Sequence, residues 1–165
     1  MNWFAVYTNP RSEKKAHAFL VEKGIEVYLP LQRTMKQWSD RKKWVEEPLF
    51  RSYLFVNIPQ NKYFEVLNTP HVVRYVTFEG KAVPIPPRQI DAIRYYLSET
   101  ETMPEEQDLQ NLKPGASVEV IRGPLRGLTG HLIEFQGRRK VRIEIEALGQ
   151  FLYLNISSND LKPAR

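Results

Sequence analysis

The sequence contains no cysteine and no long apolar run. Without cysteine there can be no disulfide, no thiolate nucleophile and no cysteine-ligated zinc. No stretch approaches the roughly 18 consecutive apolar residues that cross a bilayer. The amino terminus, Met1-Asn2-Trp3-Phe4, lacks the charged and apolar regions of a secretory signal. We therefore expect a cytoplasmic protein with no membrane partner.

Recognisable catalytic patterns are also missing. The three histidines have no metal-ligand spacing and fall in a predicted helix, a loop and a strand: His17, His71 and His131. Glu46 and Glu47 are adjacent on an extended segment, so they point apart and cannot cooperate as acid and base. The glycine-rich stretch 123–130 lacks the lysine and hydroxyl residue of a phosphate-binding loop. The sequence thus predicts a protein that is not an enzyme and that needs no metal or cofactor.

Positive charge is present and is concentrated in one place. The net charge is +5 and the sequence pI is near 9.4. Five basic residues against a single acid lie between positions 33 and 45: Arg33, Lys36, Arg41, Lys42 and Lys43. Residues 99–112 carry five acids and no base. A basic total permits nucleic-acid binding without requiring it, so the location of the charge is the more useful signal.

The first half of the chain mixes strand and helix patterns. Strands are predicted over 3–8, 25–31 and 72–78, and a short helix over 62–67. Asn9-Pro10 predicts a helix start, and Pro87 opens a helix with a core-facing stripe at Ile90, Ile93 and Leu97. Together these elements predict an α+β domain, in which a mostly antiparallel sheet is flanked by helices.

An aromatic strand, residues 53–58, is the organising element of this half. Tyr53, Phe55 and Asn57 share one face, and Leu54, Val56 and Ile58 share the other. Both faces are apolar, so the strand could be buried on both sides. Alternatively, Tyr53 and Phe55 form part of an exposed aromatic pocket for a partner.

Between positions 32 and 47 the sequence predicts a two-stranded ribbon. Met35-Lys36-Gln37-Trp38 and Lys43-Trp44-Val45 flank a polar turn at Ser39-Asp40-Arg41. Such a ribbon has little core of its own and would project from the domain. It is either a solvated hairpin braced by two tryptophans or a basic finger that contacts a nucleic-acid backbone.

In the second half of the chain, apolar residues recur at every second position, as in β-strands. The acidic run 99–112 has no apolar period and is typical of an extended linker. From Lys113 onward, short alternating strands are separated by glycine-containing turns, which predicts a small five-stranded β-barrel. The predicted domains are therefore 1–98, a linker at 99–112, and 113–165.

The segment from Val118 to Gly130, with Gly123-Pro124 at its turn, resembles a KOW motif. The first half opens with Trp3-Phe4-Ala5-Val6-Tyr7 and contains Glu47-Pro48-Leu49-Phe50 and Tyr53-Leu54-Phe55-Val56. Together these pieces resemble the NusG family of transcription elongation factors over essentially the whole chain. The last two look most similar to its specialised RfaH- and UpxY-type antiterminators.

The resemblance implies a function. The family's N-terminal domain grips the clamp helices of the largest RNA polymerase subunit through an aromatic pocket, and so suppresses pausing. The positions here that match this pocket or adjoin it are Trp3, Tyr7, Phe50, Tyr53, Phe55 and Phe78. The basic ribbon matches the segment near upstream or non-template DNA. The matching KOW loop residues, where a ribosomal protein is a further partner, are Gly123, Pro124, Leu125, Arg126, Gly127, Leu128 and Gly130.

Two departures limit what the resemblance implies. General NusG proteins place a phenylalanine after the Gly-Pro of the loop, and Leu125 stands there instead, which argues against binding to Rho. RfaH holds its C-terminal domain as a helical hairpin, whereas the alternation from Val141 to Ile145 favours strands. We therefore expect a permanent barrel, no autoinhibition and a monomer. The alternatives are a general NusG-type factor and a KOW-containing ribosome- or RNA-binding protein.

Overall fold

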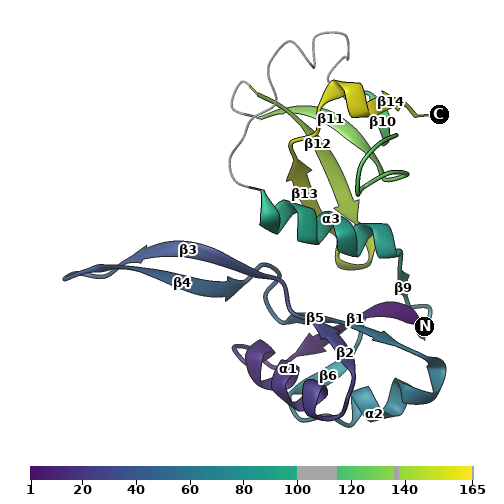
Figure 1. The fold of residues 1–165 in the computed structure, drawn as a ribbon. Helices are drawn as coiled ribbons and strands as arrows, with labels where there is room; N and C mark the ends of the chain where they lie inside the picture. The colour runs from purple at the N-terminus through teal and green to yellow at the C-terminus, as the bar shows by residue number, and fades with distance from the viewer. Residues whose placement is uncertain (100–114, 136–137, 165) are drawn as a thin grey trace. The chain divides into compact units, whose positions relative to one another are not determined.

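The computed structural model describes residues 1–99, 115–135 and 138–164, which form two compact units, Met1–Ile85 and Pro86–Arg165 (Figure 1). The first is a sheet with helices and a projecting ribbon. The second, in its described residues, contains a sheet and one α-helix.

The N-terminal unit is built on an antiparallel sheet whose order is β2-β5-β1-β6, with β9 also paired to β1. Two separate two-stranded ribbons, β3–β4 and β7–β8, complete it. The strands are β1 (Asn2–Thr8), β2 (Glu26–Tyr28), β3 (Leu31–Gln37), β4 (Lys42–Pro48), β5 (Tyr53–Ile58), β6 (Val72–Tyr75), β7 (Thr77–Phe78), β8 (Lys81–Ala82) and β9 (Pro84–Ile85). The helices are α1 (Glu13–Glu22) and α2 (Tyr63–Leu67), the latter preceded by a 3-10 turn at Gln60–Lys62.

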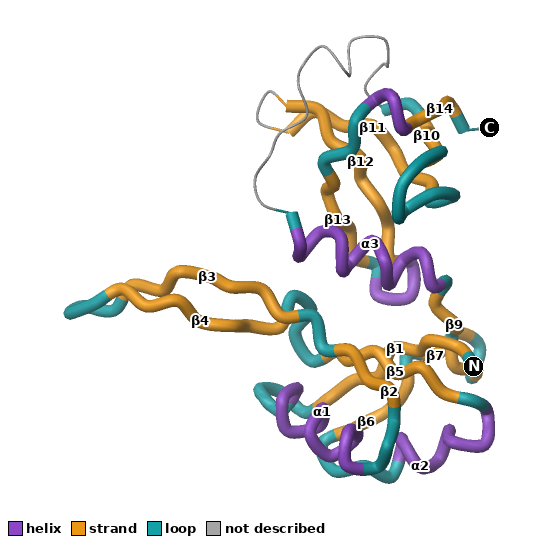
Figure 2. The backbone as a smooth tube through the Cα atoms, in the orientation of Figure 1, coloured by secondary structure: helices purple, strands orange, loops and turns teal. Residues whose placement is uncertain are grey.

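The core of this unit lies on the face of the sheet that α1 and α2 cover (Figure 2). Val6 on β1 and Leu54 and Val56 on β5 point to this face because alternate residues of a strand share a side. They pack against Leu20 of α1 and Val66 of α2, and all five are fully buried. Since this face supplies the core, the opposite face of β1 and β5 is left for another role.

The C-terminal unit contains a five-stranded antiparallel sheet in the order β13-β12-β11-β10-β14. Its elements are α3 (Pro87–Ser98), β10 (Ser117–Val120), β11 (Thr129–Phe135), β12 (Arg138–Ile145), β13 (Gln150–Leu154) and β14 (Leu161–Pro163), with 3-10 turns at Glu146–Leu148 and Ser158–Asp160. Its buried face carries alternate residues such as Val118, Val141 and Ile143. Helix α3 joins this sheet near the end of β13, where the Tyr95 hydroxyl donates to the Asn155 carbonyl oxygen at 3.1 Å.

The predicted α+β architecture of the first half is confirmed, and the second half is β-rich as expected. Closure of the C-terminal sheet into a barrel stays a prediction, because β13 and β14 are its two ends in the described residues. The bounds 1–98, 99–112 and 113–165 also stay predictions, since 100–114 lie outside the described residues. By its contacts, α3 groups with the C-terminal unit.

Candidate functional site

The face of the N-terminal sheet that α1 and α2 leave uncovered carries a row of aromatic residues. β1 and β5 pair in antiparallel register, which places Tyr7 directly opposite Tyr53 and Ala5 opposite Phe55. On the far side of β5, Tyr28 of β2 lies opposite Phe55. Directly opposed residues share a face and lie within side-chain contact. The register therefore assembles residues that are far apart in sequence into one aromatic surface.

The rings of this surface are in contact. Tyr7 and Tyr53 lie 4.8 Å apart between ring centroids at an angle of 41°. Phe55 meets Phe50 edge-to-face at 6.1 Å and lies 6.4 Å from Tyr28. Tilted and edge-to-face pairs at these distances are the arrangements that aromatic rings prefer. The surface is therefore held by ring contacts and by backbone register together.

Phe50 reaches this surface because the chain makes a tight turn just before β5. The Tyr53 N–H donates to the Phe50 carbonyl oxygen at 3.3 Å, and Ser52 adopts a left-handed φ of 65°. The Ser52 carbonyl accepts from the Thr8 N–H at 2.9 Å, and the Ser52 N–H faces the buried carboxylate of Glu13. A non-glycine residue in this region costs energy and persists only where its surroundings hold it. Glu13 of α1 is thus a positioning residue that the sequence pattern did not suggest.

The six residues predicted for the pocket are not equally placed. Phe55 is fully buried and Phe50 is 7% exposed, so these two form the floor rather than the contact surface. Trp3, also 7% exposed, lies further along the same face of β1, opposite Asn57. Tyr7 and Tyr53 are half-buried and present part of their rings. Phe78 is 71% exposed, but it lies on β7, in the separate β7–β8 ribbon. The structure therefore brings Tyr7, Tyr53, Phe50 and Phe55 together and leaves Phe78 apart.

Arg74 is a member of this surface that sequence reasoning missed. β6 pairs with β1 so that Arg74 lies opposite Tyr7, and its guanidinium sits 4.7 Å from the centroid of the Tyr7 ring. An arginine above an aromatic face adds a cation–π attraction and a fixed positive charge. The sequence could have predicted this position of Arg74, because successive residues of strand 72–75 point to opposite faces and the neighbouring Tyr75 is a core residue.

The surroundings of Tyr53 raise the pKa of its phenol above the ordinary value of 10. Burial, reinforced by a side-chain hydrogen bond with Tyr7, raises the pKa of Tyr53 to about 12. The nearby Arg74 charge opposes this pKa shift but does not reverse it. The Tyr53 hydroxyl therefore stays uncharged well above neutral pH.

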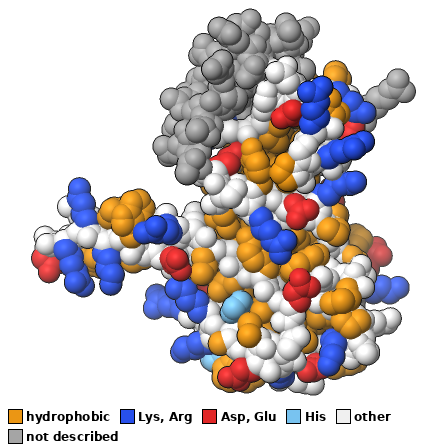
Figure 3. Space-filling model, viewed as in Figure 1, with side chains coloured by type: hydrophobic (Ala, Val, Ile, Leu, Met, Phe, Trp, Pro, Cys, Tyr) orange, Lys and Arg blue, Asp and Glu red, His pale blue; other side chains and the backbone are white. Residues whose placement is uncertain are grey.

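The second candidate region is the β3–β4 ribbon, a separate sheet that extends away from the rest of its unit (Figures 1 and 3). Its seven residue pairs run from Leu31 opposite Pro48 to Gln37 opposite Lys42, and the turn is closed by the Trp38 N–H donating to the Arg41 carbonyl at 2.8 Å. Basic side chains gather along it in Figure 3. All five predicted basic residues lie on this ribbon or its turn: Arg33, Lys36, Arg41, Lys42 and Lys43.

The charges on the ribbon differ in how they are held. Lys36 of β3 forms an ion pair with Glu47 of β4, and this ammonium lowers the pKa of the Glu47 carboxyl. Arg33 and Arg41 lie over the rings of Trp44 and Trp38, at 5.3 and 5.6 Å from the ring centroids. Lys42 and Lys43 are exposed near the turn. The distal half of the ribbon is therefore the more strongly positive part.

The third candidate region is the predicted KOW loop between β10 and β11. Leu125 and Leu128 are buried, at 3% and 5% exposed, so these side chains pack inward instead of presenting themselves to a partner. Gly123, Pro124 and Arg126 are exposed. Gly127 has φ +91°, and a Cβ there would lie 2.7 Å from the Arg88 guanidinium carbon of α3. Gly130 faces β12 so closely that a Cβ would lie 2.5 Å from the Arg142 carbonyl oxygen.

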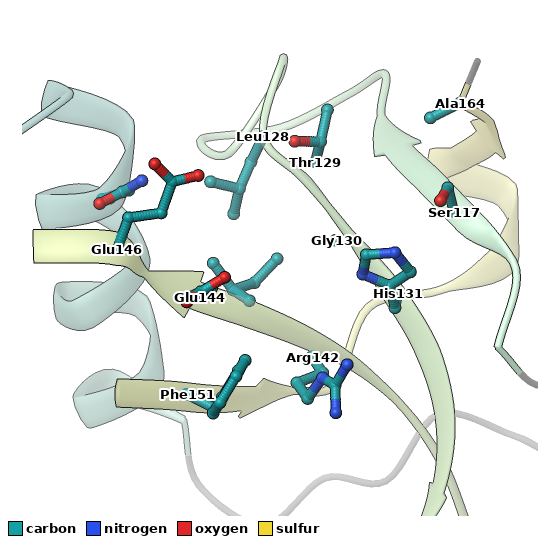
Figure 4. A pocket seen from close by; sticks show the side chains of 12 residues that line it. Ser117, Leu128, Thr129, Gly130, His131, Arg142, Glu144, Glu146, Phe151 and Ala164 are labelled. Carbon is teal, nitrogen blue, oxygen red and sulfur yellow. The ribbon is translucent and has the colours of Figure 1, made fainter. Parts of the chain in front are cut away.

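The outer face of the C-terminal sheet holds a hollow of about 400 Å³ (Figure 4). Arg142 lies 4.8 Å above the Phe151 ring, and His131 is directly opposite Arg142 on β11. Glu144 and Glu146 line the same hollow, so its charge is mixed in sign. In the described part of the chain, no three histidine or acidic residues are placed to hold a metal ion. No described helix is long and apolar enough to span a membrane.

Comparisons with known proteins show what the chain as a whole is similar to. A family model described as "Transcription termination factor nusG" matches residues 1–94. The "Transcription termination/antitermination protein NusG" of Streptococcus pyogenes serotype M1 is 26% identical over 161 residues, which cover 89% of this chain and 87% of that protein. Its namesake in Lactococcus lactis subsp. lactis is 25% identical over 162 residues, with 90% and 85% covered. A solved structure titled "Domain interaction in Thermotoga maritima NusG" is similar in fold, with TM-score 0.56, 20% identity, and 99% and 97% of the chains covered.

Proposed function

The chain belongs to the NusG family, whose members are transcription factors and not enzymes, and we propose that it is an antiterminator of the specialised RfaH- and UpxY-like branch. In this proposal the N-terminal unit binds the clamp helices of the largest RNA polymerase subunit and suppresses pausing on one or a few operons. The C-terminal unit would recruit a further partner, for which a ribosomal protein is the candidate.

One observation carries the polymerase proposal: the Tyr7–Tyr53 pair is half-buried on a sheet face that the helical core does not use. Aromatic residues that are rigid, partly exposed and backed by a buried floor are the usual anchors of protein interfaces. Here the floor is Phe50 and Phe55, and Arg74 sits over Tyr7 at one edge. Helices that carry apolar side chains and an acid would complement such a surface in shape and charge.

The β3–β4 ribbon supports a contact with DNA beside the polymerase. Lys42, Lys43 and Arg41 lie near its turn, away from the sheet that carries the aromatic surface. Phosphate contacts made by such side chains release counterions, so binding would weaken steeply with salt. A bound polymerase would hold the ribbon at high local concentration next to its own nucleic acid.

A second candidate function is that of a general NusG-type factor acting on all transcribed genes. It is favoured by the curated relatives, which carry the name of the general protein at 26% and 25% identity. Leu125 favours the specialised role, because its side chain is buried and cannot serve as the exposed aromatic contact that Rho binding in general factors would require. Rho is therefore not among the partners we propose.

The polymerase proposal is tested by measuring the affinity of the full chain for core RNA polymerase, with a clamp-helix fragment as competitor. Tyr53→Ala and Tyr7→Ala should each weaken binding by about 1–3 kcal/mol, roughly 5- to 150-fold, because each removes an interface aromatic. Phe64→Ala, on α2, is the matched control, since Phe64 is 69% exposed and lies outside the aromatic surface.

Tyr53→Phe is a control for loss of folding, because it keeps the ring that we expect to contact the polymerase and removes only the hydroxyl. We expect it to retain most of the affinity. Wild-type affinity in Tyr53→Ala and Tyr7→Ala, with unchanged thermal melting, would return both tyrosines to a purely structural role and overturn the proposed site.

A further inference from the structure

A hollow of about 630 Å³ lies at the end of the N-terminal unit where β1 begins and where α2 follows β5 (Figure 2). Its walls come from the start of β1, the turn before α2 and the β8–β9 segment, and most of its lining is apolar, including Phe4, Ile58, Tyr63 and Phe64. This volume lies within the range of roughly 300–1,000 Å³ that is usual for binding pockets. The polymerase proposal makes no use of this hollow.

Phe64 is the exposed edge of this hollow, and the core holds its ring in place. It is 69% exposed on α2, and its ring meets Tyr63 edge-to-face at 5.2 Å. Tyr63 in turn stacks at 4.2 Å on the buried ring of Tyr75. A single exposed apolar side chain is ordinary, but Phe64 borders an apolar hollow and has a fixed aromatic support. These are the properties of an anchor residue in a protein interface.

The backbone around the hollow favours a helix over a strand as the bound element. β1 is paired on both sides here, with Asn2 opposite Ile58 on β5 and Phe4 opposite Pro84 on β9. β9 contains two residues and begins with a proline, which has no N–H to donate. Strand addition requires a free sheet edge, whereas an apolar groove takes the apolar stripe of an amphipathic helix.

Lys81 gives the hollow its charge. It is the one charged side chain among the described residues that line the hollow, and it forms no ion pair with any described residue. The preceding turn fixes its position, because Glu79 and Gly80 have φ 51° and 78°, as a tight hairpin of type I′ requires. An apolar lining with a single ammonium complements a carboxylate that lies beside apolar side chains.

We propose that this hollow is a second docking site, which binds an amphipathic helix of a partner protein with Asp or Glu beside its apolar stripe. Phe64 anchors the apolar stripe, and Lys81 pairs with the carboxylate. Phe4 packs toward the helical core, and Tyr7, three positions along β1, leaves the opposite face. The hollow and the aromatic surface therefore lie on opposite sides of the sheet, and both can be occupied together.

The test selects displayed random peptides on the full chain, with Phe64→Ala as the counter-selection. The peptides are about 16 residues long, which allows roughly four helical turns. We expect enriched peptides to carry apolar residues three and four positions apart with Asp or Glu beside them. Labelled synthetic copies should bind Phe64→Ala about tenfold more weakly than the wild type in fluorescence anisotropy, because the anchor is lost. Phe64→Leu should retain most of the affinity, because it keeps an apolar anchor.

Two further variants test the charge and the location. Lys81→Glu should weaken binding of the acidic peptides and strengthen binding of copies in which Lys replaces each acid, because the sign of the site is reversed. Phe19→Ala is the matched control, since Phe19 is 40% exposed on α1 and does not line the hollow. Enrichment that ignores Phe64, or peptides without a preference for acids, would overturn the proposal.

Self-association is the rival use of the same surface, and sedimentation of the full chain without peptide detects it. A dimer that Phe64→Ala dissociates would assign the hollow to a second copy of the chain and overturn the partner helix. Phe64→Ala should still bind RNA polymerase with wild-type affinity. Loss of peptide binding with polymerase binding kept distinguishes this site from the proposed polymerase site.

Discussion

Gly130→Ala should destabilise the C-terminal unit, because β11 and β12 approach too closely at this position for any side chain. A Cβ would lie 2.5 Å from the Arg142 carbonyl oxygen, 2.5 Å from Ile143 Cδ1 and 3.0 Å from Val141 Cγ1. The first two distances are almost an ångström shorter than ordinary van der Waals contact. The Ile143 methyl could rotate, but the Arg142 oxygen belongs to the paired backbone of β12, so the strands themselves would have to separate.

Overpacking of this kind costs about 1–3 kcal/mol. Alanine offsets roughly 0.4–1 kcal/mol of this cost by restricting the unfolded chain, which leaves a net loss of up to about 2.6 kcal/mol, and about 1.3 kcal/mol at mid-range. For a unit of this size each kilocalorie lowers the melting temperature by about 4–8 °C. Amide hydrogen exchange in β11 and β12, followed by mass spectrometry on the full chain, would register the loss locally.

Gly149→Asn is the matched control in the same unit. Gly149 has a left-handed backbone conformation, with φ +62°, which asparagine tolerates. Nothing lies within 4 Å of the position that a Cβ would occupy there. We expect its exchange rates to stay close to wild type. Gly130→Ala with wild-type protection in β11 and β12 would show that the strands do not approach as closely as described, and the reasoning would be wrong.

Two further predictions concern buried hydroxyl and carboxyl groups. Tyr75→Phe should lower the unfolding free energy of the N-terminal unit by about 1 kcal/mol, because the Tyr75 hydroxyl donates to the Tyr63 carbonyl oxygen at 2.8 Å. Chemical denaturation measures this loss, and an unchanged denaturation midpoint would contradict it. Burial raises the pKa of Glu99 above 4.5, so its contribution to stability is present below pH 4.5 and is lost as the pH rises through the folded-state pKa. Glu99→Gln keeps an acceptor for the Asn155 N–H but cannot titrate, so it should make the melting temperature depend less on pH. If the melting temperature of this variant depends on pH as strongly as that of the wild type, another group causes the pH dependence.

Alternation of side chains predicted most of the fold. It located the ribbon and most strands of both units, because period-two patterns depend only on which face is buried. It missed the short strand β14, and it predicted one strand over 72–78 where the structure has two, β6 and β7. The helix start was wrong. Asn9-Pro10 predicted the beginning of α1, but Arg11 adopts φ 59° and the helix begins at Glu13. This turn lets the Asn9 N–H donate to the His71 carbonyl, a tertiary contact that no local pattern reveals.

The candidate site was only partly predictable. Tyr53 was predicted from the alternation of its strand and Tyr7 from the resemblance to the NusG family, but their adjacency needed the register between β1 and β5. Phe55 is fully buried, whereas Tyr53 on the same face is half-exposed, so the strand is not buried uniformly on this side and the partner pocket stays a prediction. Leu125 could not be placed from sequence, because a leucine after Gly-Pro is equally compatible with a buried loop and an exposed one.

The central proposal is that this chain acts on one or a few operons by binding the elongating polymerase. Its most direct test is crosslinking occupancy of the tagged protein along the genome of its host, measured beside RNA polymerase. The proposal predicts occupancy confined to one or a few long operons and lost in Tyr53→Ala. Occupancy that follows polymerase over all transcribed genes would contradict the specialised role and make the chain a general factor.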